Sequence, residues 1–399
     1  MKSEAKGITA YGFFAALAIV LIPFNAINIA GRGILIYVCI PLLLFGIVRL
    51  LSHREQLSVT LLQLSLLLFF AYYLVASLWS PKRGMDTIYN FIKVFIFTVC
   101  IAFGDYTAKE KKLLMLASFI TGLLVCAMLL WGAAAAVENS QRVTISVFGT
   151  NRDPNYLCFS LLFPALICVR GLLSKRALLA KIFFAAILLV LIYCTISTGS
   201  RGGVVALAAV IVVYFLYWGR MRRGRKILMI LVALLLVYIA QQMMSSMPEE
   251  IVNRFSYEKV AKTGGGGRMD IWMRVLRLIF ASPVRFLIGY GSGASVILAG
   301  IATHNHLLQI WLENGIVGLA LYGVFLINLL RYLLRRKNGT TIAVFFAAIL
   351  LSLTLSVQTI PSFWSVIALC IALGDYQPFF KTEAAIPQQI EDAGKEQPQ

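Results

Sequence analysis

The feature that most constrains this chain is a series of apolar runs, each about as long as a lipid bilayer is thick. They lie at residues 8–29, 33–51, 57–79, 88–104, 113–136, 155–173, 182–198, 203–219, 227–246, 315–334, 341–359 and 361–380. A helix of about 20 apolar residues crosses the hydrocarbon core, where only a helix or a closed barrel satisfies its own backbone polar groups. We therefore predict an all-α polytopic membrane protein of about 12 transmembrane helices.

The composition leaves no room for a separate soluble enzyme domain. The chain is 60% hydrophobic and only 13% charged, whereas a soluble domain is about one-quarter charged. The first apolar run is too long for a cleaved signal peptide and reads as a signal anchor. We predict one integral membrane domain over residues 1–380 and, because residues 381–399 are polar, a disordered cytoplasmic tail after it.

The formal net charge of +19 follows from topology rather than from a nucleic-acid partner. Alternate loops are rich in lysine and arginine, as cytoplasmic loops are. These loops contain Lys2 and Lys6, Arg49 and Arg54, Lys109 to Lys112, Arg170 to Lys181, Arg220 to Lys226, and Arg331 to Lys337. Both termini are therefore expected in the cytoplasm. The seven cysteines all fall in apolar runs, without metal-ligand spacing, so we expect neither a metal site nor thiol chemistry.

The longest connection, residues 247–303, is expected outside the cytoplasm. It contains a tetraglycine, Gly264–Gly267, and then a helical pattern from Arg268 to Ala281. One face of that helix carries Trp272, Val275, Leu276 and Ile279, and the other carries Asp270, Arg274 and Arg277. This amphipathic pattern is suited to the membrane interface.

Three elements on the outer side carry candidate site residues. Arg201 lies in a Ser-Arg-Gly-Gly turn beside Gly202, and Arg268 follows Gly267. Arginine binds phosphate oxygens in a bidentate way, and adjacent glycines allow phosphate to approach the backbone. The two arginines are therefore candidates for holding a diphosphate. The alternatives are an interfacial anchor at Arg201 and a solvated loop charge at Arg268.

The third element is His304-Asn305-His306, which contains two of the three histidines in the chain. Thr303 is a good helix N-cap, so we expect His304 in the first helical turn, where the dipole favours a neutral imidazole. With an unperturbed pKa of about 6.5, such an imidazole is a competent general base. We expect His304 to be the base, Asn305 to support it and His306 to be structural. The alternative is a histidine that only hydrogen-bonds a loop.

These motifs, in this order, resemble a known family. His-Asn followed by nine residues, Gly315 and Gly318 is similar to the signature of the bacterial O-antigen ligase and O-antigen polymerase superfamily. The Ser-Arg-Gly-Gly turn, the Gly-Arg-x-x-x-Trp motif ending at Trp272 and the Gly-x-Gly-x-Gly motif from Gly289 resemble its other motifs. The resemblance covers roughly residues 140–330.

The resemblance implies a fold related to the C-type glycosyltransferases, with a long extracytoplasmic loop. It also implies a glycan donor on undecaprenyl diphosphate, a glycan or glycolipid acceptor, and no metal ion or other cofactor. By position, His304 corresponds to the family's essential histidine, and Arg201 and Arg268 to the arginines that hold the donor diphosphate. The expected location is the cytoplasmic (inner) membrane of a bacterium, among membrane lipids, with the active face outside the cytoplasm.

Two other classes of protein have a similar composition. A flippase for the same lipid-linked oligosaccharide would also have many helices and cationic residues, but the outer basic residues cluster on one face rather than around a central cavity. A membrane scaffold would not need the ordered motifs. Within the enzyme class, the sequence does not distinguish a ligase from a polymerase.

Overall fold

The computed structural model describes residues 7–25, 27–52, 59–81, 85–131, 134–136, 143–147, 150–174, 176–217 and 267–376, with the single positions 238, 242, 252 and 255. Apart from those four positions, the predicted span at 227–246, the loop residues 247–266 and the predicted tail at 381–399 lie outside this part of the chain.

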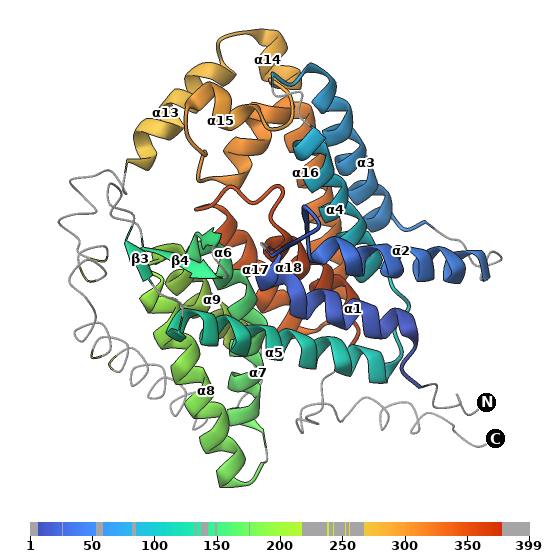
Figure 1. Cartoon of the computed structure of the whole chain (residues 1–399), viewed down its shortest axis with the longest axis vertical. Coiled ribbons are helices and arrows are strands. Elements are labelled where there is room, and N and C mark those ends of the chain that lie inside the picture. Colours follow the sequence, from blue (N-terminus) through green and yellow to red (C-terminus); the bar gives the residue numbers. More distant parts are fainter. Residues whose placement is uncertain are drawn as a thin grey trace, which may run out of the picture.

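The described chain is mostly helical (Figure 1). Its first half contains α1 (Ala10–Leu21), η1 (Ile22–Phe24), α2 (Leu35–Ser52), α3 (Leu61–Ala76), η3 (Ser77–Trp79), α4 (Met85–Ala102), α5 (Ala108–Trp131), α6 (Pro154–Leu157), η4 (Cys158–Leu161), α7 (Leu162–Leu173), α8 (Leu178–Ser197) and α9 (Arg201–Tyr217). Its second half contains α13 (Arg268–Ile279), α14 (Pro283–Ile288), α15 (Ala294–Ala299), α16 (His306–Arg336), α17 (Gly339–Ser352) and α18 (Pro361–Ala372).

The all-α prediction missed short strands in two connections. β1 (Asn28–Ile29) pairs with β2 (Arg32–Gly33), and β4 (Val143–Val147) lies between β3 (Ala134–Ala136) and β5 (Thr150–Arg152), all antiparallel. Residues in β4 are mostly β-branched, which favours strands. The predicted span at 113–136 therefore ends as a helix at Trp131, and its last residues join the sheet.

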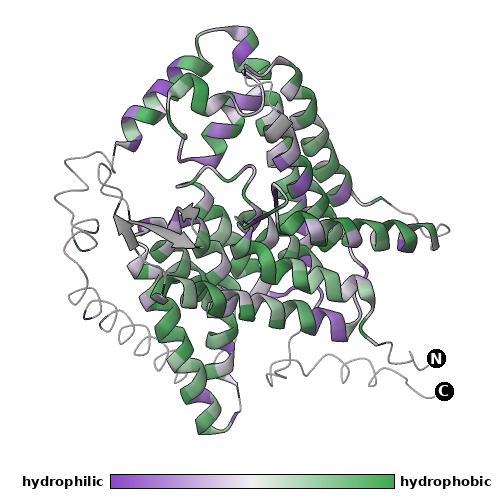
Figure 2. Ribbon diagram, viewed as in Figure 1, coloured by the Kyte–Doolittle hydropathy of each residue, from purple (hydrophilic) through white to green (hydrophobic). Residues whose placement is uncertain are grey.

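The helices make this a multi-pass membrane protein. Within the described residues, five helices are long and apolar enough to cross a membrane, and six further apolar helices have 10–17 residues. The five are Leu61–Trp79, Ala108–Trp131, Pro154–Leu173, Leu178–Ser197 and His306–Arg336. Figure 2 shows apolar residues along α3, α5 and α8, whereas hydrophilic and apolar residues alternate on α13.

The helices pack around one large apolar core and a smaller one. Large aromatic side chains such as Phe69, Phe325 and Trp364 are fully buried in the large core. The smaller core consists of Val275 and Ile279 of α13, Ala299 of α15 and Leu312 of α16. Helices α13, α14 and α15 thus form a cap at one end of the molecule, seated on the start of α16 (Figure 1).

The apolar face of the cap helix α13 does not lie where the prediction of an interfacial helix placed it. Its predicted apolar face, with Val275 and Ile279, is buried against protein rather than left for lipid. The exposed apolar side chains of this helix are Met269 and Met273, which are 52% and 48% exposed. Any contact of α13 with the membrane would therefore involve these methionines.

Helix α16 begins before the predicted apolar run at 315–334 and contains a break. It starts at His306, two residues after the start that a cap at Thr303 would give, and Gly315 interrupts it with φ 66° and ψ −172°. The break leaves the carbonyls of Leu312 and Glu313 without their usual helical partners. The N–H groups of Tyr290 and Gly291 donate to them instead, at 2.9 and 2.8 Å. The Gly-x-Gly-x-Gly segment thereby fixes the cap to the helix that follows the candidate histidine.

Close packing at this junction explains its glycines. A Cβ at Gly289 would overlap the carbonyl of Glu313, and one at Gly315 would overlap that of Leu287. Both glycines also have positive φ, a conformation that side chains with a Cβ rarely adopt.

Candidate active site

His304 has an unusual backbone conformation. Its φ is 49°, and among the three non-glycine residues with positive φ in the described chain it is the only buried one. The others, Ala30 and Lys337, are exposed in connections. Histidine is more tolerant of this region than most residues, but holding it there costs on the order of 1 kcal/mol and is common at functional sites.

The predicted N-cap at Thr303 is wrong. The cap of α16 is Asn305, whose side chain accepts from the N–H of Leu308 at 3.1 Å, and the helix starts at His306. Asparagine caps at least as well as threonine, and the positive φ of His304 turns the chain just before it. His304 therefore precedes the helix and is not in its first turn. Asn305 contributes by fixing where the helix begins.

The loop between α17 and α18 holds His304 in place. The N–H of His304 donates to Ser356 Oγ at 3.0 Å, and the hydroxyls of Thr303 and Ser356 are 2.9 Å apart. The hydroxyl of Tyr156 in α6 donates to the carbonyl of Ser356 at 3.2 Å. The residues around the histidine are thus bonded to elements about 50 and 150 positions away in sequence.

Arg268 is the first residue of α13, and this helix is hydrogen-bonded to the residue before His304. The indole N–H of Trp272 donates to the carbonyl of Thr303 at 3.0 Å. Arg268 lies four residues before Trp272 in α13, and residues four apart share one face of a helix. Gly267 caps this helix in a left-handed conformation with φ 77°, and the space around its Cβ position is open. Arg268 is therefore on the same face of α13 as Trp272, the residue that bonds to Thr303.

Arg201 begins a helix that packs against the loop that holds His304. It is the first residue of α9, after a turn in which Gly199 has φ 62°. A Cβ on Gly202 would lie 3.2 Å from Thr354 Cβ and closer still to its hydroxyl. Thr354 is two residues from Ser356, a separation of roughly 7 Å at most along an extended chain. The start of α9 therefore contacts the loop that holds His304, and α13 is bonded to the residue before His304.

The two glycines after Arg201 are packed closely against neighbouring side chains. A Cβ on Gly203 would lie 2.6 Å from Cys158 Sγ, and its N–H donates to Ser200 Oγ at 3.1 Å. Gly202 is pressed against Thr354 in the same way. These glycines allow α9 to approach its neighbours closely.

Two polar residues that follow His304 in the sequence, His306 and Glu313, lie inside the protein. His306 is fully buried, with its ring 5.0 Å from that of Tyr322 and 5.4 Å from that of Phe363. Glu313 is also fully buried, and its Oε1 accepts from Ser295 N–H and from Gln309 Nε2, each at 3.3 Å. These contacts make both residues parts of the packing below the site.

Ser356 and Tyr156 were not among the residues predicted from the sequence. Ser356 falls inside the predicted span at 341–359. In the structure it lies in a loop, because α17 ends at Ser352 and the next helix starts at Pro361. A signal was present, because Thr354, Ser356 and Gln358 alternate with apolar residues at the end of that run. Alternation of this kind is not typical of a membrane helix and could have indicated its end.

Comparison with known proteins identifies one segment of the chain. Residues 184–323 match the model of the O-antigen ligase family. No curated protein matches the chain. The matched segment includes Arg201, Arg268 and His304. Residues 184–323 are thus an O-antigen ligase domain, which confirms the resemblance of the chain to the O-antigen ligase and polymerase superfamily.

Proposed function

We propose that this protein transfers a glycan from an undecaprenyl-diphosphate carrier to a sugar hydroxyl of a glycan or glycolipid acceptor. The reaction takes place on the outer face of the bacterial cytoplasmic membrane and uses neither a nucleotide sugar nor a metal ion. The O-antigen ligase domain supports a ligase- or polymerase-type function in general. The donor, the acceptor, the orientation and the residue roles are parts of the proposal.

In the proposed reaction, His304 accepts the proton of the acceptor hydroxyl. The hydroxyl oxygen forms a bond to the anomeric carbon of the donor sugar, and the bond from that carbon to the diphosphate oxygen breaks. Undecaprenyl diphosphate leaves with the bonding electrons. Arg201 and Arg268 stabilise the negative charge that develops on it, which is the usual function of preorganised cations at a leaving group.

The observation that carries the proposal is the backbone of His304. A buried histidine is held at φ 49° by a hydrogen bond from its own N–H to Ser356. The neighbouring carbonyl of Thr303 accepts from Trp272, on the helix that begins with Arg268. A histidine serving only to hydrogen-bond a loop would not require this conformation, whereas a base that must meet a substrate at a fixed position would.

The test is transfer by purified full-length protein in nanodiscs, supplied with undecaprenyl-diphosphate glycan and a saccharide acceptor. We expect His304→Ala to reduce transfer by at least about 100-fold, in the range typical of a lost general base. Arg201→Lys and Arg268→Lys should each retain the charge but lose bidentate binding, and so raise the KM of the donor. His306→Gln is the matched control for removing an imidazole that lies outside the site.

Wild-type rates in His304→Ala, with normal insertion and yield, would remove the histidine from the mechanism. Two incubations of the wild-type protein distinguish a ligase from a polymerase. Incubation with the donor alone gives longer chains if it is a polymerase, and no product until a second acceptor is added if it is a ligase. A flippase would instead move the donor across the bilayer without extending or transferring it.

A further inference from the structure

A cavity of about 230 Å³ lies next to the candidate active site. Its walls come from η1, the start of α6 and η4, and the start of α18. The polar residues in the wall are Asn25, Asp153, Tyr156, Ser160 and Ser362, and the others are apolar. The volume is somewhat below the roughly 300–1,000 Å³ of sites for drug-sized ligands, which suits a single six-membered ring.

One residue separates this cavity from His304. Tyr156 lines the cavity, and its hydroxyl donates to the carbonyl of Ser356 at 3.2 Å. The side chain of Ser356 accepts from the N–H of His304 at 3.0 Å. A ligand against Tyr156 would therefore be linked to the proposed base through two hydrogen bonds, by way of Ser356.

The polar groups in the wall retain hydrogen-bonding capacity. Asp153 Oδ1 caps α6 by accepting from the N–H of Asn155 at 2.9 Å, while its Oδ2 accepts no hydrogen bond from the described chain. Asn25 Oδ1 is buried and likewise has no partner among the described residues. Ser362 Oγ donates to the carbonyl of Tyr156 at 3.0 Å and can still accept. A ring bearing several hydroxyls would satisfy these groups.

The remaining wall suits the apolar face of such a ring. Pro23, Leu157, Ile360 and Pro361 supply aliphatic surface, and Tyr156 supplies an aromatic ring. Sugars combine hydroxyl groups at the edge with C–H groups on the faces, so they match a pocket with a few polar groups and an apolar remainder. Among the described residues the wall contains one carboxylate and no cation, which favours a neutral hydroxylated ligand over a phosphate.

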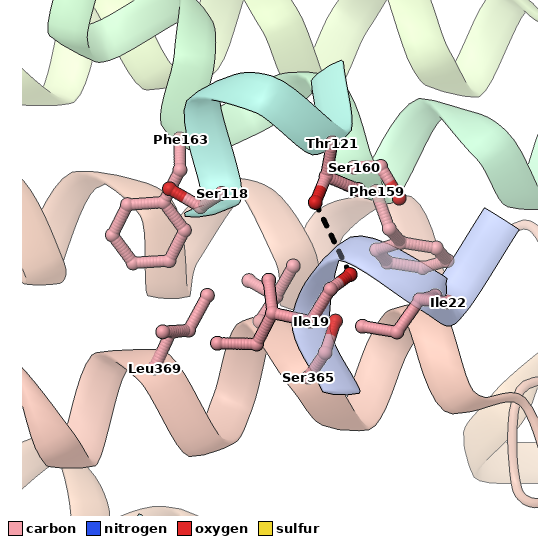
Figure 3. A pocket seen from close by; sticks show the side chains of 10 residues that line it. Ile19, Ile22, Ser118, Thr121, Phe159, Ser160, Phe163, Ser365 and Leu369 are labelled. Atoms are coloured by element: carbon pink, nitrogen blue, oxygen red, sulfur yellow. Dashed lines mark hydrogen bonds between the residues drawn. The ribbon is translucent and has the colours of Figure 1, made fainter. Parts of the chain in front are cut away.

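The inner end of the cavity is closed to a sugar. A second, water-sized cavity of about 10 Å³ shares Ile22 and Ser160 with the first and lies between α1, α5, α7 and α18 (Figure 3). Within it, the Thr121 hydroxyl donates to the carbonyl of Ile19 at 3.1 Å. A space of this size holds about one water molecule. A ring that enters the larger cavity therefore stops there.

We propose that this cavity is a saccharide subsite, which binds one sugar ring of a glycan substrate beside His304. The proposal rests on the proposed glycan transfer and deepens it. Asp153 and Asn25 bind ring hydroxyls, and Tyr156 packs on the ring face. The sugar comes either from the acceptor or from the donor glycan, and kinetics separate these two sources.

The first experiment is direct binding without turnover. Methyl glycosides of glucose, galactose and N-acetylglucosamine are added to the full-length protein in nanodiscs, and saturation-transfer NMR detects which of them bind. The principal variant is Asp153→Asn, because asparagine caps a helix as well as aspartate and so preserves α6. Asn25→Ala is the second. The matched control is Asp105→Asn, an exposed aspartate in the loop before α5, lining a separate cavity.

We expect at least one glycoside to bind the wild-type protein, and its binding to weaken at least tenfold in Asp153→Asn and Asn25→Ala but not in Asp105→Asn. Binding should persist in His304→Ala, because His304 is not in the wall. In the transfer assay, Asp153→Asn should raise one KM at least tenfold. A raised acceptor KM assigns the ring to the acceptor, and a raised donor KM assigns it to the donor.

The proposal is overturned if no glycoside binds, if Asp153→Asn and Asn25→Ala bind as well as the wild type, or if neither KM rises in Asp153→Asn. A different result would refute the proposed function without refuting the sugar subsite. Undiminished transfer by His304→Ala, together with binding that depends on Asp153, would refute the base and leave the sugar subsite intact.

Discussion

Replacing Gly202 by alanine tests how tightly the arginine helix is coupled to the loop that holds His304. The added methyl would lie 3.2 Å from Thr354 Cβ, 3.3 Å from Leu351 Cδ1, and closer still to the Thr354 hydroxyl. That hydroxyl cannot move aside without cost, since it donates to the carbonyl of Leu351 at 2.9 Å. Two residues farther along the same loop, Ser356 accepts from His304.

The expected magnitude follows from two opposing effects. Overpacking of this kind costs about 1–3 kcal/mol, whereas alanine in a helix is favoured over glycine by about 0.5–1 kcal/mol. Gly202→Ala should therefore destabilise the protein by about 0.5–2 kcal/mol. Gly323→Ala in α16 is the matched control, because nothing lies within 4 Å of its Cβ position. That variant should be slightly more stable than the wild type.

The assay is unfolding of the purified protein in mixed micelles, followed by tryptophan fluorescence, together with the transfer rate. A double-mutant cycle with Thr354→Ala isolates the contact. Thr354→Ala loses a hydrogen bond of about 0.5–1.5 kcal/mol, but it also makes room for the methyl of Ala at 202. The double variant should therefore be more stable than the sum of the two single changes predicts. Additive losses, or equal stabilities of Gly202→Ala and Gly323→Ala, would refute the reasoning.

Three further substitutions test the cap and the start of α16. Gly315→Ala should prevent recovery of monodisperse protein in size-exclusion chromatography, because its Cβ would overlap a backbone carbonyl at φ 66°; a normal yield would show that the break is dispensable. Trp272→Phe keeps the ring but loses the hydrogen bond to Thr303, so the transfer rate should fall about 2–10-fold, the equivalent of about 0.5–1.5 kcal/mol, with little change in the melting temperature. Asn305→Ala should cost about 1 kcal/mol in chemical unfolding, and Asn305→Asp should cost much less, because aspartate still caps the helix; equal losses would argue against capping.

Much of the site was predictable from local sequence. The chain has only three histidines, and most of its basic residues fall in the loops predicted to be cytoplasmic, so Arg201, Arg268 and His304 on the predicted outer side stand out without a structure. The helix from Arg268 is predictable as well, because the spacing of Trp272 to Ile279 has a helical period. The strands at 134–152 were missed because residues 134–136 extend an apolar run, and only pairing with Val143–Val147 makes them a strand.

What the sequence by itself determined is the mostly helical membrane architecture, the resemblance to the O-antigen ligase family and the residue types of the candidate site, since hydropathy and short motifs are local properties of the chain. Only the tertiary structure decided how these parts are used. Thr303 does not cap α16, because the positive φ of His304 keeps that residue out of the helix, which begins behind Asn305. The cavity at Asp153 brings together residues as far apart in the sequence as Ile22 and Ser362, and its link to His304 joins Tyr156 to Ser356. A single sequence carries no signal for such pairings, because they arise only when separate helices pack together.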